Sequence, residues 1–342
     1  MTNLQKKLSP CTFYPFFHAR GVHFDEAVHV LPPFSCTGCN GYKKIAYLCI
    51  MKRIAVILAA IVLADIIYAQ TPIVAPNFSE PTMVSTEYFG PNAFPVPDMT
   101  DGRVKPYVYA EIAADYYKGR IADGNDHTWD GFLRLSFPLW TKRATLEIWG
   151  PVVEHWKYSD AVADYRRIGE ARSQTKSWDS GDIYIGTNIH LLQGKSNTFK
   201  PDIVVRAVLK SAMGNTFEQA RYYDCGGYFF DGTIAWSRQF QFSYVREVRA
   251  GISGGFLCWQ DGLARQNDAV MYGLFASIYT WGFTFTADYS GYIGWENDGD
   301  RPRRLRLKFE GNAGRWRPFL QYTRGMKNYP FDGIRLGLGY CF

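Results

Sequence analysis

From about residue 104 to the last residue, apolar side chains alternate with polar or small ones in one short segment after another. In the ending GIRLGLGYCF, one face of such a segment holds Ile334, Leu336, Leu338, Tyr340 and Phe342. Successive side chains of a β-strand point to opposite faces, so this pattern predicts strands with one apolar and one polar face. A soluble sandwich and a membrane barrel both contain such strands. They differ in whether the apolar face meets a core or lipid.

Twelve alternating segments are predicted to be strands. They are 104–119, 127–138, 142–158, 181–193, 200–213, 226–238, 241–258, 267–280, 282–296, 303–312, 315–325 and 330–342. A soluble domain of this size needs some strands or helices that are covered on both faces, yet no segment is continuously apolar. Repeated segments of about ten alternating residues are typical of outer-membrane barrels.

The gaps between the segments support the same fold. Gaps after odd-numbered segments are long (159–180, 214–225, 259–266 and 297–302), and gaps after even-numbered segments are mostly short (139–141, 239–240, 281 and 313–314). Outer-membrane barrels combine short periplasmic turns with longer external loops. The sequence therefore predicts an all-β fold over 104–342, a transmembrane antiparallel up-and-down β-barrel of about 12 strands with both termini periplasmic.

Aromatic content also fits a membrane barrel. Phe, Trp and Tyr make up 17% of the chain, and the mean hydropathy of −0.21 is too low for a helical membrane protein. Tryptophans at strand ends predict the interfacial girdle in which such rings sit. They are Trp129, Trp140, Trp156, Trp236, Trp259, Trp281, Trp295 and Trp316.

A targeting signal lies inside the chain. Residues 51–70, MKRIAVILAAIVLADIIYAQ, have a basic start, an apolar stretch and a small residue before Gln70. This order is that of a cleaved secretory signal peptide at 51–69, so we interpret Met51 as the true start and 1–50 as a mis-called upstream extension. A cytoplasmic extension followed by a signal anchor at 45–68 remains the alternative. The CTGC sequence at 36–39 has metal or redox spacing but no second ligand pair.

Residues 70–103 are rich in Pro and Asn and have no periodicity, which predicts a periplasmic arm or a segment that lines the lumen. The end of the chain resembles the assembly signal that the insertion machinery of bacterial outer membranes reads. The residues that carry this resemblance are Arg335, Gly337, Tyr340 and Phe342.

Polar faces of the strands predict charged side chains in the lumen, where they tune solute selectivity or fill the barrel with ion pairs. The pore-lining candidates are Arg134, Glu147, Arg206, Lys210, Arg249, Arg304, Arg306, Lys308 and Glu310, with Glu111, Asp115, Asp288 and Arg335 on the same face. The run Arg304, Arg306 and Lys308 predicts a weak preference for anions.

Enzyme chemistry finds little support in the sequence. After Met51 the histidines are His127, His155 and His190, and none has a Ser within two residues as the Ser/His arrangement of an outer-membrane phospholipase would need. We expect no catalytic residues, no metal site and no cofactor. The excess of Lys and Arg over acids is small after residue 69, so nucleic acid is not an expected partner.

Part of the middle of the chain is similar to a known family. The stretches SGDIYIGTNIHLL, KPDIVVRAVLKSAMGN and GGYFFDGTIAWS resemble the outer-membrane proteins named for the meta-pathway of phenol degradation, among the channels for hydrophobic substrates. Gly181 and Asp182 match one motif of that family, and Lys210 and Gly214 match another, in which Ala212 and Met213 replace the expected Pro and Thr. The resemblance implies a channel.

We therefore expect an outer-membrane channel or transporter for small solutes, exported through the signal peptide, with membrane lipid and the insertion machinery as partners. One alternative is a non-conducting barrel that anchors a surface complex through the 159–180 loop, which could also fold inward and constrict the pore. An outer-membrane enzyme or adhesin is a further alternative.

Overall fold

The computed structural model describes residues 87–342, apart from 140–141, 170–172, 215, 217, 224–225, 242–243, 261–265 and 296–298. Several predictions concern residues outside this range. They are the extension at 1–50 with its CTGC motif, the signal peptide at 51–69, the first part of the 70–103 segment, and Trp140.

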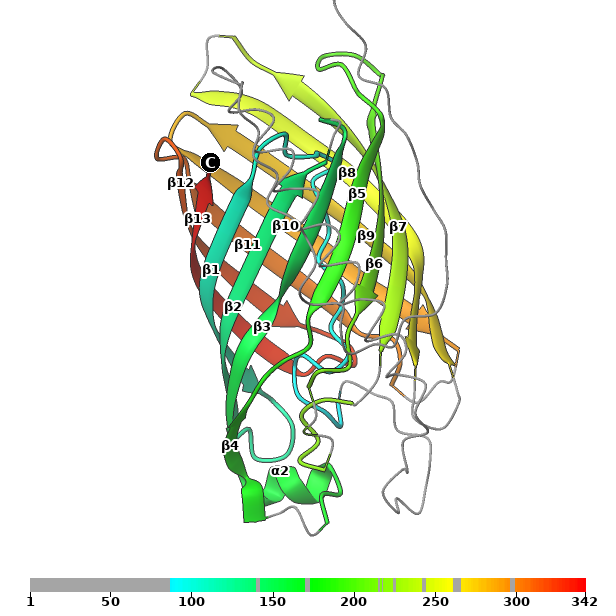
Figure 1. Cartoon of the computed structure of the whole chain (residues 1–342), viewed down its shortest axis with the longest axis vertical. Coiled ribbons are helices and arrows are strands. Elements are labelled where there is room, and N and C mark those ends of the chain that lie inside the picture. The colour runs from blue at the N-terminus through cyan, green and yellow to red at the C-terminus, as the bar shows by residue number, and fades with distance from the viewer. Residues whose placement is uncertain are drawn as a thin grey trace, which may run out of the picture. The chain divides into compact units, whose positions relative to one another are not determined.

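Twelve antiparallel strands close into a barrel (Figure 1). They are β1 (Tyr109–Gly119), β2 (Asp126–Pro138), β3 (Ala144–Tyr158), β5 (Tyr184–Leu192), β6 (Asp202–Lys210), β7 (Gly227–Gln239), β8 (Val245–Gln260), β9 (Gln266–Thr280), β10 (Phe283–Gly294), β11 (Arg303–Gly311), β12 (Trp316–Gly325) and β13 (Phe331–Cys341). Each strand pairs with its sequence neighbours, and the pairing of β1 with β13 closes the barrel. The predicted fold class is confirmed.

A thirteenth strand, β4 (Lys176–Asp179), extends the edge of β3 beyond the barrel. It lies within the predicted 159–180 loop, which also contains the helix α2 (Asp160–Tyr165). The Ser159 side chain caps α2 by accepting a hydrogen bond from the Val162 backbone amide. The long connection therefore contains secondary structure, and α2 and β4 lie at one end of the barrel, below the strands in Figure 1. We call this the loop end.

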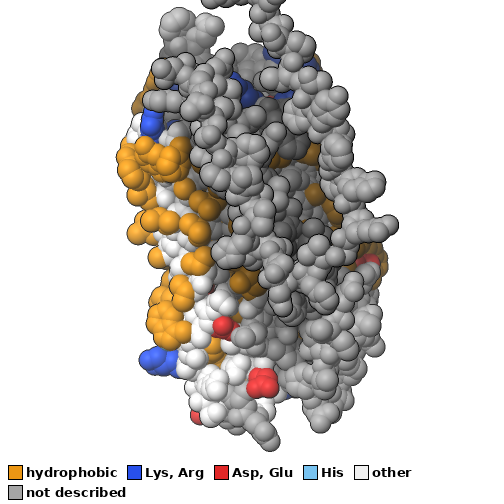
Figure 2. Space-filling view, viewed as in Figure 1, with side chains coloured by type: hydrophobic (Ala, Val, Ile, Leu, Met, Phe, Trp, Pro, Cys, Tyr) orange, Lys and Arg blue, Asp and Glu red, His pale blue; other side chains and the backbone are white. Residues whose placement is uncertain are grey.

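The apolar face of the strands forms the outside of the barrel. On β13, Ile334 is 49% exposed and Leu336 is 65% exposed, whereas Phe331 on the inner face is fully buried. Figure 2 shows hydrophobic side chains gathered on the flank at the left, where Figure 1 places β12, β13 and β1, with Lys or Arg near both ends of this band. A closed barrel with such a surface satisfies its backbone hydrogen bonds internally while lipid covers the apolar side chains.

A hydrophobic core fills the interior near the loop end. Val162 and Ala163 of α2 are fully buried and belong to the same cluster as Phe94, Trp156 and Trp259. The girdle interpretation is therefore wrong for Trp156 and Trp259, which face inward. By contrast, five of the predicted girdle residues lie exposed on the surface, namely Trp129, Trp236, Trp281, Trp295 and Trp316.

Residues 87–108 run through the interior of the barrel as an irregular segment, coloured cyan in Figure 1. At the loop end, the Asn328 side chain donates a hydrogen bond to Glu87 at 2.7 Å. At the opposite end, the Phe342 backbone amide donates to the Val108 carbonyl at 2.9 Å. The described chain thus begins at the loop end and reaches the other end before β1 starts, and the start of β1 lies beside the end of β13 there.

In the part of the chain that the structure describes, no helix has the length and apolar character needed to cross a bilayer.

Candidate functional site

One aspartate of the internal segment gathers arginines from three strands. The Asp98 carboxylate lies 2.6 Å from both Arg304 and Arg306 on β11, and 3.3 Å from Arg134 on β2. Its backbone carbonyl accepts a hydrogen bond from Arg206 on β6 at 2.8 Å. We call these five residues the Asp98 junction. Charge-assisted contacts of this kind are the strongest hydrogen bonds in proteins, so the junction fixes the middle of the segment to the wall.

Wall carboxylates hold the junction arginines from the other side. Arg306 Nε donates to Asp288 on β10 at 2.7 Å, and Arg206 Nε donates to Asp231 on β7 at 2.9 Å. The junction arginines Arg206 and Arg306 are therefore paired with wall carboxylates, as buried charges require. The interior is consequently not a free basic surface, contrary to the premise of the predicted anion preference.

The segment is also bound toward the end that holds Phe342. Arg249 donates from Nε to the Asp101 carbonyl at 2.6 Å and from Nη2 to the Gly102 carbonyl at 3.0 Å. Gly102 has a φ of +70°, and a Cβ there would lie 3.1 Å from both the Ala235 Cβ and Arg249 Nη2. A glycine at 102 thus allows the backbone to turn against the wall.

Toward the loop end, the segment joins a buried polar cluster. Asn92 Nδ2 donates to Asp130 at 2.7 Å and to Glu154 at 2.9 Å. Arg221, fully buried in the connection between β6 and β7, donates to Glu154 at 2.8 Å. Arg166, which follows α2, donates to the Phe89 carbonyl at 3.0 Å. The connections 159–175 and 211–226 therefore both contribute to closing the loop end over the segment.

Tyr222 in the same connection donates a hydrogen bond to Glu154 Oε2 at 3.0 Å. Burial, and after it the charge of Glu154, raises the pKa of Tyr222 well above its ordinary value. The phenol therefore stays neutral and remains a donor to Glu154 over the physiological pH range.

The remaining predicted lumen residues lie apart from the junction. Lys308 on β11 pairs with Glu310 at 2.8 Å, beside the ring of Phe319. Glu147 on β3 is half-buried and lies opposite Ser136 and Gly186 in the strand register. The nine candidates therefore lie at different heights in the barrel and do not form one ring.

The residues that carry the family resemblance come together at one place. The Lys210 ammonium lies 2.5 Å from the Asp182 carboxylate, and both side chains are almost fully buried. The Gly214 amide donates to Asp182 Oδ1 at 2.9 Å. A Cβ on Gly181 would lie only 2.4 Å from Pro151 Cγ, so this position has no room for a side chain. The two motifs thus build one buried ion pair between β5 and β6.

The predicted assembly signal occupies the end of β13. Arg335 and Gly337 face inward, where Arg335 binds Asp115 on β1 through two contacts of 2.6 Å. Tyr340 faces outward and packs against Trp316 at 4.7 Å between ring centroids and against Phe342 at 4.8 Å.

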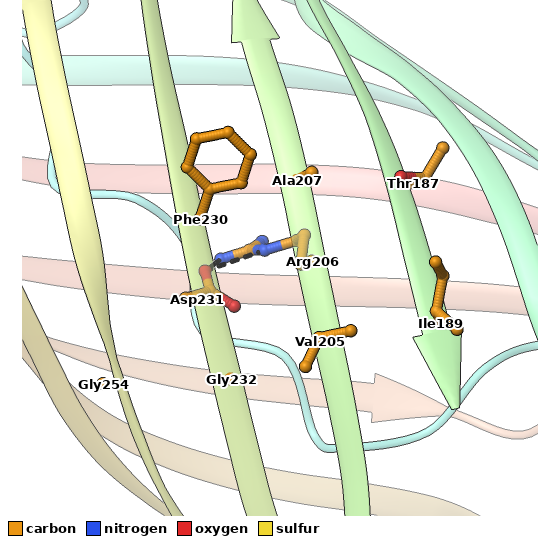
Figure 3. A pocket seen from close by; sticks show the side chains of 9 residues that line it. All are labelled: Thr187, Ile189, Val205, Arg206, Ala207, Phe230, Asp231, Gly232 and Gly254. Carbon is orange, nitrogen blue, oxygen red and sulfur yellow. Dashed lines mark hydrogen bonds and ion pairs between the residues drawn. The ribbon is translucent and has the colours of Figure 1, made fainter. Parts of the chain in front are cut away.

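A depression of about 350 Å³ lies in the wall formed by β5 to β8 (Figure 3). Ile189, Val205 and Phe230 line it with side chains of the outer face, and the Arg206–Asp231 ion pair lies behind them. A Cβ on Gly232 or Gly254 would have no atom nearer than 3.9 Å, so the missing side chains create the space. The depression therefore opens toward lipid.

Sequence reasoning missed Asn92, Asp98 and Asp101, because they precede the strands, in a segment without the alternation that identifies inward side chains. The available signal was the pair of carboxylates at 98 and 101 in a stretch whose preceding ten residues carry no charge. Among the described residues, no group of three or more His, Cys, Asp or Glu side chains is placed to hold a metal ion.

Neither a protein-family model nor a curated protein matches this chain. Among solved structures, the KdgM porin in complex with disordered oligogalacturonate is 8% identical, with a TM-score of 0.40 over 68% of this chain and 99% of that one. The NanC porin is 11% identical, with a TM-score of 0.42 over 68% of this chain and 98% of that one. The transport unit of the autotransporter AIDA-I from Escherichia coli is 13% identical, with a TM-score of 0.41 over 72% and 93%.

Proposed function

We propose that the protein is a bacterial outer-membrane channel for small solutes, and that its own segment 87–108 closes it in the conformation described. The Asp98 junction carries this proposal. Inward arginines of β2, β6 and β11 converge on an aspartate that belongs to no strand. A barrel that serves only as an anchor does not need a carboxylate supplied by a separate internal segment, because carboxylates of the wall strands alone can pair with its inward arginines.

The way in which the segment is held supports a plug that moves. Residues 87–108 form no strand or helix. Phe89, Ala93, Phe94 and Val96 pack in the hydrophobic core near the loop end, and residues 98–103 contact the wall through side-chain hydrogen bonds and ion pairs. Four prolines, Pro91, Pro95, Pro97 and Pro106, lack the amide that a β-ladder needs. Such contacts separate one at a time, whereas removal of a strand would open the barrel.

The orientation follows from the connections. The loop end carries the long connections with α2 and β4, and we place it outside the cell, since periplasmic turns are short. Phe342 and the predicted assembly signal then face the periplasm, from which the insertion machinery acts. Export through the signal peptide at 51–69 completes this proposal.

A reversible covalent link tests whether the segment is the gate. The Thr100 and Thr233 hydroxyl oxygens lie 3.0 Å apart, so cysteines at both positions are within reach of a disulfide between the segment and β7. The variant Thr100→Cys/Thr233→Cys, combined with Asp98→Asn to weaken the junction, is compared in planar bilayers before and after reduction. The two single-cysteine variants control for the native cysteines.

We expect the oxidised protein not to conduct, and reduction to restore the conductance of Asp98→Asn. Equal conductance in both states would show that the segment is not the gate. A correctly folded, heat-modifiable protein that never conducts, even as Asp98→Asn, would instead support the non-conducting anchor. Strand β4 within the 159–180 connection favours that second candidate, because it presents Trp178, 66% exposed, on a structured surface.

A further inference from the structure

Four aromatic rings form a continuous row on the outer face of the barrel near the loop end. The strand register places Tyr116, Trp129, His155 and Trp178 side by side across β1, β2, β3 and β4. Their ring centroids are 5.5, 5.4 and 4.2 Å apart from one neighbour to the next. Trp129 is 41% exposed and Trp178 is 66% exposed. The row is therefore an ordered aromatic surface that faces away from the protein core.

A basic row lies beside it, two residues farther toward the loop end. The register aligns Lys118, His127, Lys157 and Lys176 on the same four strands. All three lysines are exposed. We call the two rows together the rim patch.

The one carboxylate in line with the basic row is already neutralised. Asp332 on β13 lies opposite Lys118 in the register, and it pairs with Arg324 and, at 3.6 Å, with Arg120. These two arginines carry more positive charge than Asp332 removes. The positive charge of the basic row is therefore not offset by Asp332 on the neighbouring strand β13.

Hydrogen bonds fix the histidine rings of the rim patch. The His155 Nδ1–H donates to the Ser177 carbonyl at 2.8 Å, because a carbonyl can only accept. His127 Nδ1 and the Tyr116 hydroxyl share a hydrogen bond of 2.8 Å. The rings are consequently held in place before a ligand arrives, which lowers the entropy lost on binding.

We infer that the rim patch binds the phosphorylated headgroup of a lipid in the membrane leaflet at the loop end. Aromatic rings of a girdle lie at headgroup depth, which places the lysines of the basic row at the level of lipid phosphates. Below the aromatic row, the outward side chains are apolar, with Ala114 and Ile112 exposed on β1 and Leu336 exposed on β13. The lipid phosphates thus lie against the basic row, the carbon atoms next to the phosphates lie against the aromatic row, and the acyl chains lie against the apolar side chains below it. The rim patch lies outside the barrel and binds lipid whether or not the interior conducts.

Binding of defined lipids to the purified full-length protein tests this assignment. The probes are lipid A that carries two phosphates and the same lipid after both phosphates are removed, titrated in detergent and followed by native mass spectrometry. The test variant is Lys118→Gln/Lys157→Gln/Lys176→Gln. The control is Lys142→Gln/Lys195→Gln/Lys200→Gln, which removes the same charge from exposed lysines in the short turns at the opposite end.

A basic residue near a charged membrane surface contributes about 1 kcal/mol, which is roughly fivefold in affinity. We therefore expect the test variant to bind phosphorylated lipid A about a hundredfold more weakly than the wild type, and the control variant to bind it within about threefold of the wild type. Trp178→Ala, which leaves every barrel strand intact, should also weaken binding. Heat-modifiable migration shows that each variant is folded.

Three results would overturn the assignment. Equal binding of lipid A with and without phosphates would show that the lysines do not recognise the phosphates. An equal loss in the test and control variants would mean that net charge alone decides. Inorganic phosphate that binds as tightly as the lipid, with the same dependence on the three lysines, would identify a site for a soluble anion and not for a membrane lipid.

Discussion

Substitution of Asp98 by asparagine should loosen the internal segment without disturbing the barrel. Asn keeps the size of the side chain but removes the charge that Arg134, Arg304 and Arg306 share. Arg306 keeps Asp288 as a partner, so the loss falls mainly on the other two arginines.

The expected magnitude follows from burial. Removing one partner of a fully buried ion pair costs about 3–5 kcal/mol. The Asp98 side chain is 28% exposed and that of Arg134 is 23% exposed, so solvent screens part of the interaction. We therefore expect about 2–3 kcal/mol, which shifts the balance between bound and released segment roughly 30- to 150-fold.

Labelling of a cysteine at position 100 measures this shift. Thr100 contacts the wall on β7, so the thiol of Thr100→Cys should react with a membrane-impermeant maleimide only while the segment is released. When release and return are fast, the labelling rate follows the released population. We expect Asp98→Asn to raise that rate by the same 30- to 150-fold.

Asp288→Asn is the matched control. It removes one negative charge from the same Arg306 guanidinium, but from β10 instead of the segment. Labelling at position 100 should then change less than about threefold. If both substitutions raise the labelling rate equally, overall loosening of the barrel, and not the Asp98 junction, controls access to position 100. If Asp98→Asn does not raise the labelling rate, the Asp98 junction does not hold the segment in place.

Other parts of the chain give further predictions. Arg221→Met should lower the free energy of unfolding by about 3–5 kcal/mol, because it leaves the buried Glu154 without its cationic partner. The midpoint of urea unfolding should fall accordingly, and the control Arg238→Met, at an exposed position, should leave that midpoint unchanged. Gly337→Val should slow assembly into the heat-modifiable form, since a Cβ there would lie 2.3 Å from a ring carbon of Phe319. Mass spectrometry of outer-membrane fractions should find a mature chain that begins near Gln70, and peptides that span 20–45 would contradict the mis-called start.

Alternation predicted the strands well because a period of two fixes which face a side chain occupies. The largest error is at the start of β1, predicted at 104 and found at Tyr109. Residues 104–108, VKPYV, alternate like a strand, but Pro106 has no amide to donate to a ladder. The four residues of β4 were too few to show a period.

A β-bulge explains the error at Trp156. The register of β2 with β3 shifts between Gly131 and Phe132, because Gly131 lies opposite Val153 and Phe132 lies opposite Pro151. One extra residue reverses the faces for the rest of a strand. Trp156 therefore turns into the core, although its position at a strand end resembled that of a girdle residue.

Charge pairing was beyond the reach of the sequence, since alternation identifies the face of a residue and not its partner. Arg304, Arg306 and Lys308 were correctly placed on the inner face, yet Asp98, Asp288 and Glu310 compensate their charges. Glu310 is near enough in sequence to be recognised as a partner. Asp98 lies more than 200 residues away in the chain, in a segment without periodicity.

The same pairing predicts the selectivity of the open channel. When the segment leaves, the charge of Asp98 leaves the junction with it, while Asp288 and Glu310 stay on the wall. Arg304 then loses its carboxylate, and the interior gains positive potential, which narrow low-dielectric walls reinforce. Asp98→Asn protein under a KCl gradient should therefore give an anion-selective reversal potential. The further change Arg304→Gln/Arg306→Gln/Lys308→Gln should reduce or reverse it, because it leaves the two wall carboxylates unpaired. A cation-selective potential before that change would mean that wall carboxylates, and not the arginines released from Asp98, dominate the open interior.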